Sequence, residues 1–375
     1  MSQNICATTA TWNNGGVTYD GLKIGTCEVN INAASSFIHI VQTGTCNICF
    51  KVDNGMCIND MTIGNYPSDC RNTTFVGAGA GQCNTVDYVT GVGAGALRCT
   101  STALYSTAVG YNAGYKNNST CSVHFGAYAG AVTVGGTGCN VTNIGAYAGC
   151  GTGTSTSVNT VAIGMYADCN TIGKTNTVSI GYQAGSVYNT CYSVCIGGQA
   201  GGQTRANCSV LIGSLAMYAK GAAVNPNNVV IGHNAAMLGT IYVSTVAIGW
   251  CAGRNNSTDS VYIGSKTGAN KVVTSNCNTI IGDGAACGFT TSNCCNVIIG
   301  SCCAFRSITN GSRNVMIDSQ RGVDRVANSS INDSVLIGWN GFRNTTGAIS
   351  CSVALGGSAG YCMTAAPLLA TMVGQ

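Results

Sequence analysis

The sequence predicts an all-β protein, a parallel β-solenoid or β-roll of about 18 coils. Three observations predict it: an apolar-apolar-Gly tripeptide that returns about every 17 residues, a second glycine shortly after many of these tripeptides, and a low content of charge. A fixed short period indicates that each copy is one structural unit, buried only by the copies beside it. We therefore expect a rod of stacked coils and not a globular enzyme.

The last residue of each tripeptide, called here the repeat glycine, marks one coil. Successive copies are spaced about 13 to 20 residues apart, and Asp318 takes the place of one of them. The other copies end at Gly64, Gly77, Gly93, Gly110, Gly126, Gly145, Gly164, Gly181, Gly197, Gly213, Gly232, Gly249, Gly264, Gly282, Gly300, Gly338 and Gly356.

Composition supports burial over disorder. Only 7% of the 375 residues are charged, whereas a soluble domain has about 25%, and 45% are hydrophobic, with Val and Ile in register. The 16 Lys and Arg are scattered, so we expect no nucleic-acid partner. The chain has no run of 18 apolar residues and no signal peptide at its start, so we expect no membrane insertion and assembly in the cytoplasm.

The coil at residues 176–185 illustrates the expected strand. Alternation puts Val178 and Ile180 on one face and Thr177 and Ser179 on the other. Because Val and Ile are the apolar pair, we expect them to point into the solenoid and the two hydroxyl residues to point outward.

Two tight corners then close the coil. Gly181 ends the strand where a residue with a Cβ would be strained, Ala184 is expected to point inward again, and Gly185 makes the second corner. The polar segments that follow, such as residues 115–120, absorb the differences in length.

Most coils offer only one aliphatic pair and one Ala, too little to enclose a core alone. A homotrimer, with three such walls packed around an axis, would cover the apolar face.

These units resemble a known kind of repeat. The Ala-Ile-Gly-x-x-Ala-Gly pattern is similar to the repeats of phage and algal-virus tail-fibre proteins and to the head repeats of trimeric autotransporter adhesins. It is closest at residues 159–164, 176–185 and 245–253, and the match extends over about residues 61–362. The resemblance implies a trimeric parallel β-roll used in attachment, with no catalytic residues.

The two ends depart from the period and suggest three segments. Residues 1–60, with strands expected at 37–41 and 48–52, form an N-terminal cap or attachment module. Residues 61–362 form the repeat shaft. Residues 363–375 are apolar and almost uncharged, and we expect them to form a C-terminal docking tail, because the end of a solenoid exposes unpaired strand edges.

Cysteine is abundant, with 24 residues, and follows the repeat. Five of these residues lie five positions before a repeat glycine, where other coils have Asn, and three lie five positions after one. One interpretation is a ladder of small buried thiols in a chain assembled under reducing conditions. The alternative is disulfides between neighbouring coils or chains. The five preceding residues are Cys121, Cys208, Cys277, Cys295 and Cys351, and the three following residues are Cys150, Cys169 and Cys287.

No pattern of catalytic or metal-binding residues is expected. The three histidines, His39, His124 and His233, fall at unrelated positions of the repeat and are interpreted as structural or surface residues. The only C-x-x-C motif, Cys46 to Cys49, has Cys57 and His39 as near candidates for further zinc ligands, and buried thiols are the favoured interpretation. We therefore expect no enzyme activity, no metal and no cofactor.

Aromatic residues recur one or two positions after the repeat glycines. A column of rings on a rod is a candidate surface for stacking against sugars, and the alternative is that the rings cover corners or pack between subunits. These residues are Tyr111, Tyr128, Tyr147, Tyr166, Tyr182, Trp250 and Trp339.

Together these features favour a structural virion fibre, similar to a tail fibre, that mediates host attachment from the virion surface. Its expected partners are two further copies of itself, other virion proteins and a host-surface glycan. A filament that polymerises end to end and has no receptor role is the main alternative. An enzyme on a β-helix, such as a polysaccharide lyase, is disfavoured because 28 charged residues do not supply a charged groove.

Overall fold

The computed structural model describes residues 22–24, 27–32, 37–42 and 73–374, the last range with gaps at 133–137, 152–156, 170–173, 187–190, 204, 219–224, 238–241, 255–256, 270–274, 287–292, 302–309, 319–329, 339–347 and 358–368. The chain divides into two compact units, Met1–Thr62 and Ile63–Gln375. Each unit has its own sheet structure.

The first unit contains a three-stranded antiparallel sheet. Its strands are β1 (Leu22–Ile24), β2 (Cys27–Asn32) and β3 (Phe37–Gln42), and β2 pairs with both of the others. β3 confirms the strand expected at 37–41. The second expected strand, at 48–52, and the Cys46 to Cys49 motif lie outside the described residues.

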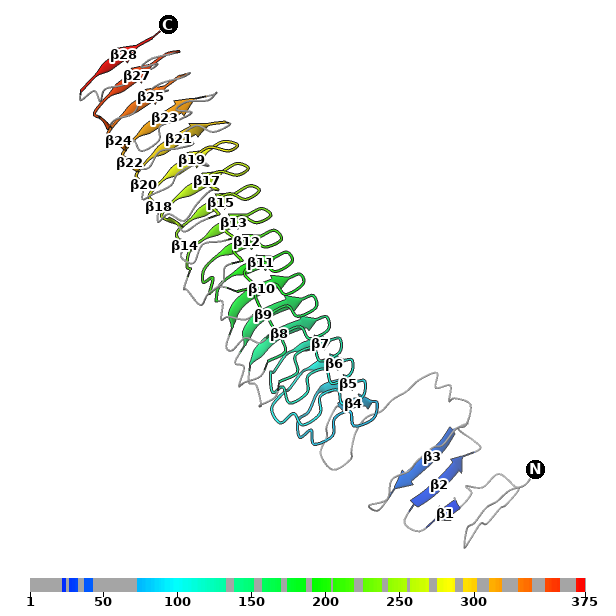
Figure 1. Cartoon of the computed structure of the whole chain (residues 1–375). Helices are drawn as coiled ribbons and strands as arrows, with labels where there is room; N and C mark the ends of the chain where they lie inside the picture. Colours follow the sequence, from blue (N-terminus) through cyan, green and yellow to red (C-terminus); the bar gives the residue numbers. More distant parts are fainter. Residues whose placement is uncertain are drawn as a thin grey trace. The chain divides into compact units, whose positions relative to one another are not determined.

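The second unit is an all-β parallel solenoid. Its main ladder runs from β4 at one end of the stack to β28 at the other, and each strand pairs in parallel with the next (Figure 1). The strands are β4 (Thr73–Val76), β5 (Val89–Val92), β6 (Thr107–Val109), β7 (Val123–Phe125), β8 (Cys139–Ile144), β9 (Val158–Ile163), β10 (Thr175–Ile180), β11 (Val194–Ile196), β12 (Val210–Ile212), β13 (Val229–Ile231), β15 (Val246–Ile248), β17 (Val261–Ile263), β19 (Thr279–Ile281), β21 (Val297–Gly300), β23 (Val315–Asp318), β25 (Val335–Ile337), β27 (Val353–Leu355) and β28 (Thr371–Val373).

A second parallel ladder lies beside the first in the C-terminal part of the solenoid. Each of its short strands comes just before a strand of the main ladder and is separated from it by a sharp corner (Figure 1). The strands are β14 (Tyr242–Val243), β16 (Ser257–Thr258), β18 (Ser275–Asn276), β20 (Asn293–Cys294), β22 (Asn310–Ser312), β24 (Ser330–Asn332) and β26 (Ile349–Ser350).

The parallel stacking predicted from the repeat is confirmed, and the number of coils is refined. The main ladder contains 18 strands, but the structure supports a solenoid of about 12 turns, fewer than the 18 coils expected from the repeat. The first predicted repeat, ending at Gly64, lies outside the described residues. At the other end, β28 adds a strand within the segment 363–375, where the sequence suggested a docking tail and no further coil.

The face of the strand that points inward is the opposite of the one expected. In β10, Thr177 and Ser179 are fully buried, whereas Val178 and Ile180 are only half-buried. Alternation identifies which residues share a face, but it does not say which face lines the coil, and a one-residue difference exchanges the two. Ala184, three positions after the repeat glycine, is fully buried as expected.

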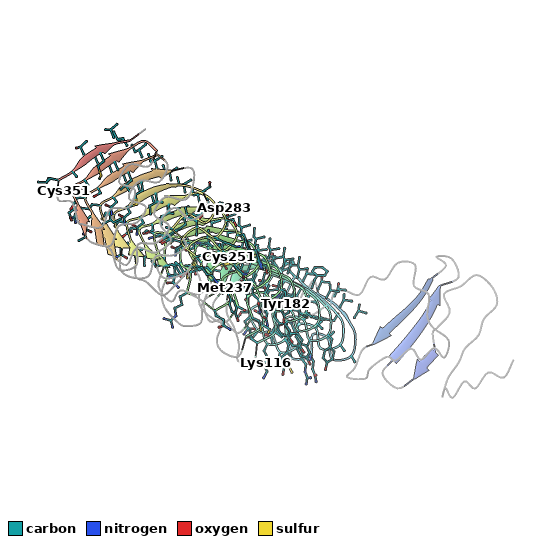
Figure 2. The ribbon with its side chains drawn as sticks, turned by 45° about the horizontal axis from the view of Figure 1, so that its top comes forward. Lys116, Tyr182, Met237, Cys251, Asp283 and Cys351 are labelled. Atoms are coloured by element: carbon teal, nitrogen blue, oxygen red, sulfur yellow. The ribbon has the colours of Figure 1, made fainter. Side chains whose placement is uncertain are left out.

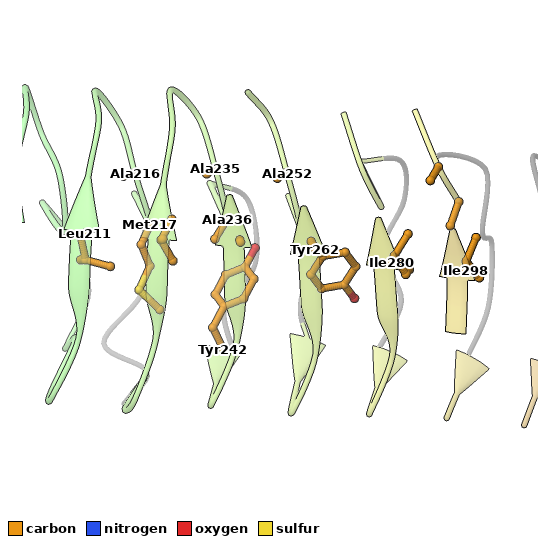
Figure 3. Close-up of a cluster of buried hydrophobic side chains, with 14 of the residues drawn as sticks. Leu211, Ala216, Met217, Ala235, Ala236, Tyr242, Ala252, Tyr262, Ile280 and Ile298 are labelled. Atoms are coloured by element: carbon orange, nitrogen blue, oxygen red, sulfur yellow. The ribbon is translucent and has the colours of Figure 1, made fainter. Parts of the chain in front are cut away.

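The interior is filled mainly by the residue two positions before each repeat glycine, a set we call the inner column. Its members differ in size and chemistry from one coil to the next, as Leu211, Tyr262, Ile280 and Met316 illustrate. Figure 3 shows Leu211, Tyr262 and Ile280 along the stack, with alanines of the corners, such as Ala216 and Ala252, nearby. Neighbouring coils therefore compensate for one another in volume, which explains why this column shows no fixed residue type.

The repeat glycine is required by both backbone conformation and space. Gly181 has φ +130°, and a Cβ at this position would lie 2.6 Å from the carbonyl oxygen of Gly197 in the next coil. Side chains other than hydrogen are excluded there. The exception, Asp318, is the last residue of β23 and pairs with Gly300, so the strand itself continues through this position.

Candidate interaction surfaces

The outward side of the main ladder is a mainly aliphatic surface, with Thr at some positions and Phe at one. We define the aliphatic face as the residues one and three positions before each repeat glycine, as in Val194 and Ile196 of β11 or Val210 and Ile212 of β12. From β4 to β28, every member is Val, Ile, Thr, Leu or Phe, and none is charged. Parallel pairing places each residue beside its equivalent in the next strand, so the face continues from β4 to β28.

Many large side chains of this face are substantially exposed. Ile212 is 36% exposed, Ile299 38% and Ile337 42%, which is unusual for Ile in an otherwise well-packed fold. The inner column varies from His to Ser to Met, whereas the outer position remains Val or Ile in nearly every coil. The chain thus maintains aliphatic character more strictly on the outside of the coil than in its interior. Contiguous exposed apolar surfaces are typical of interaction sites in proteins generally.

Four of the seven predicted aromatic residues form one column. The rings of Tyr128 and Tyr147 stack with centroids 5.0 Å apart, as do those of Tyr147 and Tyr166, and Tyr111 meets Tyr128 edge-on at 5.2 Å. We call these four residues the tyrosine column. Partial burial, and then the neighbouring phenols of Tyr128 and Tyr166, raise the pKa of Tyr147.

The other three predicted residues do not join the tyrosine column. Tyr182 is 46% exposed. Trp250 is also exposed, and its ring lies under the Lys266 ammonium, with Nζ 4.8 Å from the ring centroid. Trp339 lies outside the described residues. Figure 2 draws the side chains along the solenoid and labels Tyr182.

A second exposed column was only partly recognised in the sequence. The residue five positions before each repeat glycine occupies the left-handed region in coil after coil, with φ near +55°, and we call this set the corner column. It contains a stacked pair, Tyr88 and Tyr105, and an amide ladder in which Asn140 donates to Asn159 and Asn159 to Asn176. The sequence indicates this conformation only through the recurrence of Asn, alternating with Cys, at this position, because Asn tolerates the left-handed region.

The cysteines of the corner column are not buried. Cys121, Cys208, Cys277, Cys295 and Cys351 are all exposed, which corrects the interpretation of this set as a ladder of buried thiols. The left-handed backbone makes a sharp corner here, and the buried residues are those that follow it, such as Ser122 and Ser209. Figure 2 labels Cys351, the last of the five.

The corner column also carries an ion pair in the C-terminal part. Arg313 donates through Nη2 to Asp333 Oδ2 at 2.8 Å across neighbouring coils. The hydrogen bond, and then the charge of the partner, raise the pKa of Arg313, while the same hydrogen bond lowers that of Asp333. Both side chains are well exposed, so the pair orders the corner and contributes little to stability.

The interior between β7 and β11 contains several buried polar side chains, which the repeat pattern does not predict. His124 is buried, and Asn143 Nδ2 donates to its Nδ1 at 3.1 Å, which leaves the proton of the neutral ring on Nε2. Burial lowers the pKa of His124 to about 4. Two coils further on, Lys174 pairs with Asp168 and donates to the carbonyl of Gly185 inside the solenoid.

Asn143 and Asp168 also line a small cavity of about 20 Å³. This is room for about one water molecule, and the lining offers it several hydrogen-bond partners. Among the lining residues are Asn117, Ser119, Asn143, Thr160 and Asp168. The cavity is suited to a structural water and is far too small for an organic substrate.

The described part of the chain contains no group of three or more His, Cys, Asp or Glu side chains arranged to hold a metal ion. His124 lies in the interior and His233 on the surface, at unrelated places in the coil. Over the same residues, no helix has the length and apolar character needed to cross a bilayer.

Comparison with known proteins gives no match to any family model, curated protein or solved structure. The resemblance to fibre repeats implied both a fold and a family, and the structure shows only the fold, a parallel β-solenoid. Function is therefore inferred from the surfaces of the solenoid itself.

Proposed function

We propose that this chain is the shaft of a structural fibre, and that three copies pack their aliphatic faces around a common axis. The observation that carries the proposal is the exposed, uncharged column of Val and Ile that runs through the main ladder. In a single chain this column faces solvent, and association with further copies removes it from water.

The spacing of side chains along the aliphatic face favours a second copy of the same chain as the binding partner. Side chains recur along the ladder at the strand spacing of about 4.8 Å. A second parallel solenoid has the same repeat, so each coil can pack against a coil of the partner along the whole stack. Partners of another architecture would match only a few coils.

The size of the face is adequate for stable association. Full burial of one Val or Ile removes on the order of 100 Å² of apolar surface, given about 1.5–3 kcal/mol per side chain and about 25 cal/mol per Å². If about a third of that area remains exposed at some 30 positions, association buries on the order of 1,000 Å² per copy, against about 800 Å² for a standard interface.

The proposal also includes a role in attachment to a host surface. The tyrosine column offers a row of flat rings with polar hydroxyl groups at regular spacing, and Tyr111 is 53% exposed. Such rings stack on the apolar faces of sugars while the hydroxyls hydrogen-bond to them. We assign this column to a host-surface glycan and the whole chain to a virion surface, where other virion proteins would hold it.

One observation favours the alternative of an end-to-end filament. β28 is the last strand of the main ladder, and Val373 at its end is 76% exposed. Among the described strands β28 pairs with β27 alone, and an edge strand is a template for pairing with a further strand. A filament would use this end in addition to the aliphatic face.

Sedimentation of the full chain tests the shaft proposal. A double variant, Ile212→Asp with Ile231→Asp, places two charges in the aliphatic face of neighbouring strands. The matched control, Cys208→Asp with Asn227→Asp, adds the same charges to the corner column of the same two coils, where both residues are exposed.

We expect the wild-type chain and the control to sediment at three times the chain mass, and the face variant to dissociate or to lose at least tenfold in association constant. A wild-type monomer would contradict the proposal, as would a trimer that is equally stable in both variants. Long filaments in the wild type would favour the alternative.

A further inference from the structure

Two cysteine side chains from neighbouring coils meet beside the tyrosine column. Cys150 follows the corner after β8, and Cys169 follows the equivalent corner after β9. Their sulfur atoms are 2.9 Å apart, in hydrogen-bonding contact. Cys150 is half-buried, whereas Cys169 is only 6% exposed.

The surrounding backbone holds the two residues in register. Gly149, the residue before Cys150, donates through N to the carbonyl of Ala167, two residues before Cys169, at 2.8 Å, and the rings of Tyr147 and Tyr166 stack just upstream. Neighbouring parallel strands are about 4.8 Å apart, and a disulfide spans Cα atoms about 4.4–6.8 Å apart. Equivalent positions in consecutive coils are therefore spaced within the range that a disulfide spans, and the contact between the two sulfur atoms agrees with this.

We propose that Cys150 and Cys169 form a redox-sensitive modification site, which closes as a disulfide between two coils when the chain meets a small-molecule disulfide. The half-buried Cys150 is the thiol within reach of the oxidant. The buried Cys169 is the resolving thiol, since it is protected from solvent but in contact with the Cys150 sulfur.

The chemistry is two successive thiol–disulfide exchanges. The Cys150 thiolate attacks one sulfur of the oxidant, so that a mixed disulfide forms and the first small thiolate leaves. The Cys169 thiolate then attacks the Cys150 sulfur, forms the protein disulfide and releases the second small thiolate. The two protons lost by the cysteines are taken up by the two released thiolates, and the oxidant gains the two electrons that the cysteines lose.

This pair differs from the other neighbouring cysteines in its location. Cys83 interacts with Cys99, and Cys277 with Cys295, but Cys83, Cys277 and Cys295 are exposed. An exposed mixed disulfide at those positions remains open to attack by any thiol in solution. At Cys150 the nearest attacking group is the buried Cys169, which makes closure within the chain the favoured outcome.

The test uses the full chain with oxidised glutathione as the probe, followed by alkylation of the remaining thiols and chymotryptic digestion. Cleavage after Tyr166 separates Cys150 from Cys169, so a disulfide between them joins two peptides. We expect these peptides to be joined in most chains, and dithiothreitol to separate them. Alkylation of both residues after treatment, while other cysteines have reacted, would overturn the proposal. So would joining of Cys150 or Cys169 to a cysteine of another chain.

Variants distinguish the two roles. In Cys169→Ser, the glutathione adduct at Cys150 is expected to persist, because the resolving thiol is gone, and in Cys150→Ser no adduct is expected at Cys169. Cys121→Ser serves as the control, since Cys121 is an exposed cysteine of the corner column, and it should form the crosslink as the wild type does. An equal yield of glutathione adduct at Cys150 in wild type and Cys169→Ser would contradict the resolving role.

Discussion

Asn296 donates through Nδ2 to Oδ1 of Asn278 at 3.0 Å, inside the solenoid. Both residues lie four positions before a repeat glycine, and Asn314 continues the pattern by donating to Asn296 Oδ1 at the same distance. The three amides thus form a buried ladder along the stack axis. It connects successive coils through side chains as well as through the backbone.

Removal of one amide from this ladder should destabilise the solenoid. In Asn296→Ala, Asn314 Nδ2 retains its bond to the Ile331 carbonyl, but its backbone N–H and the Gly311 carbonyl lose their Asn296 partners. Each buried group left without a partner costs about 1–3 kcal/mol. We expect a clear fall in the unfolding temperature. The control, Asn159→Gly, interrupts the exposed amide ladder while keeping a left-handed backbone, and its effect should be small. Equal shifts would argue against a role for burial.

The repeat glycine gives a second test, with a control in the same coil. Gly197→Ala would put a Cβ at φ +129°, 2.6 Å from the Gly213 carbonyl oxygen, whereas a Cβ at the adjacent Gly198 meets nothing nearer than 3.9 Å. Backbone strain alone costs about 1–3 kcal/mol, and the steric clash adds to it. We expect a large loss of thermal stability in Gly197→Ala and little change in Gly198→Ala. Similar melting curves would show that the coils are not stacked as closely as described.

Protonation of His124 should make the solenoid less stable in mild acid. Burial holds its pKa in the folded chain at about 4, against about 6.5 when exposed. Both states are neutral above pH 6.5. As the pH falls from about 6.5 towards 4, the unfolded chain binds the proton first, and stability declines by up to about 1.4 kcal/mol per pH unit. Below pH 4 this contribution levels off.

The measurement is the unfolding temperature at pH 7 and pH 4.5 for the wild type and for His124→Asn. Asn already occupies the inner column in the next coil, at Asn143, so the substitution fits the site. We expect the variant to lose less stability on acidification than the wild type. The surface variant His233→Asn should behave like the wild type. The same pH dependence in all three proteins would contradict a neutral buried His124.

The tyrosine column makes a prediction about binding. Tyr147 stacks on both neighbours, so its replacement interrupts the column, and Tyr147→Asn keeps the left-handed backbone at φ +57°. One aromatic contact contributes about 0.5–1.5 kcal/mol, which corresponds to a loss of about two- to tenfold in affinity. A glycan array should show this loss for sugars that bind the wild type. Tyr105→Asn, in the corner column, is the control, and an equal loss there would exclude a specific role of the tyrosine column.

The sequence was sufficient to predict the repeating coil. It did not predict which face of the strand points inward or which side chains meet between neighbouring coils. The period and the repeat glycines predict parallel stacking, because a parallel stack places the repeat glycine of each coil, such as Gly181, in contact with the repeat glycine of the next coil. The same alternation could not decide whether Val178 or Ser179 faces the interior. Apolar residues normally line a core. The sequence does not show whether that core lies inside a single solenoid or at an interface between chains. The polar interior at His124 and the contact between Cys150 and Cys169 depend on which coils are neighbours in space, so they appear only once the stack is built.

The central claim is that the aliphatic face is buried between copies of the chain, and cryo-electron microscopy of the purified full-length protein tests it most directly. We expect particles in cross-section to contain three solenoid walls, with the columns of Ile212 and Ile231 facing a common axis. Single solenoids whose aliphatic face is open to solvent, or assemblies in which this face lies on the outside, would contradict it.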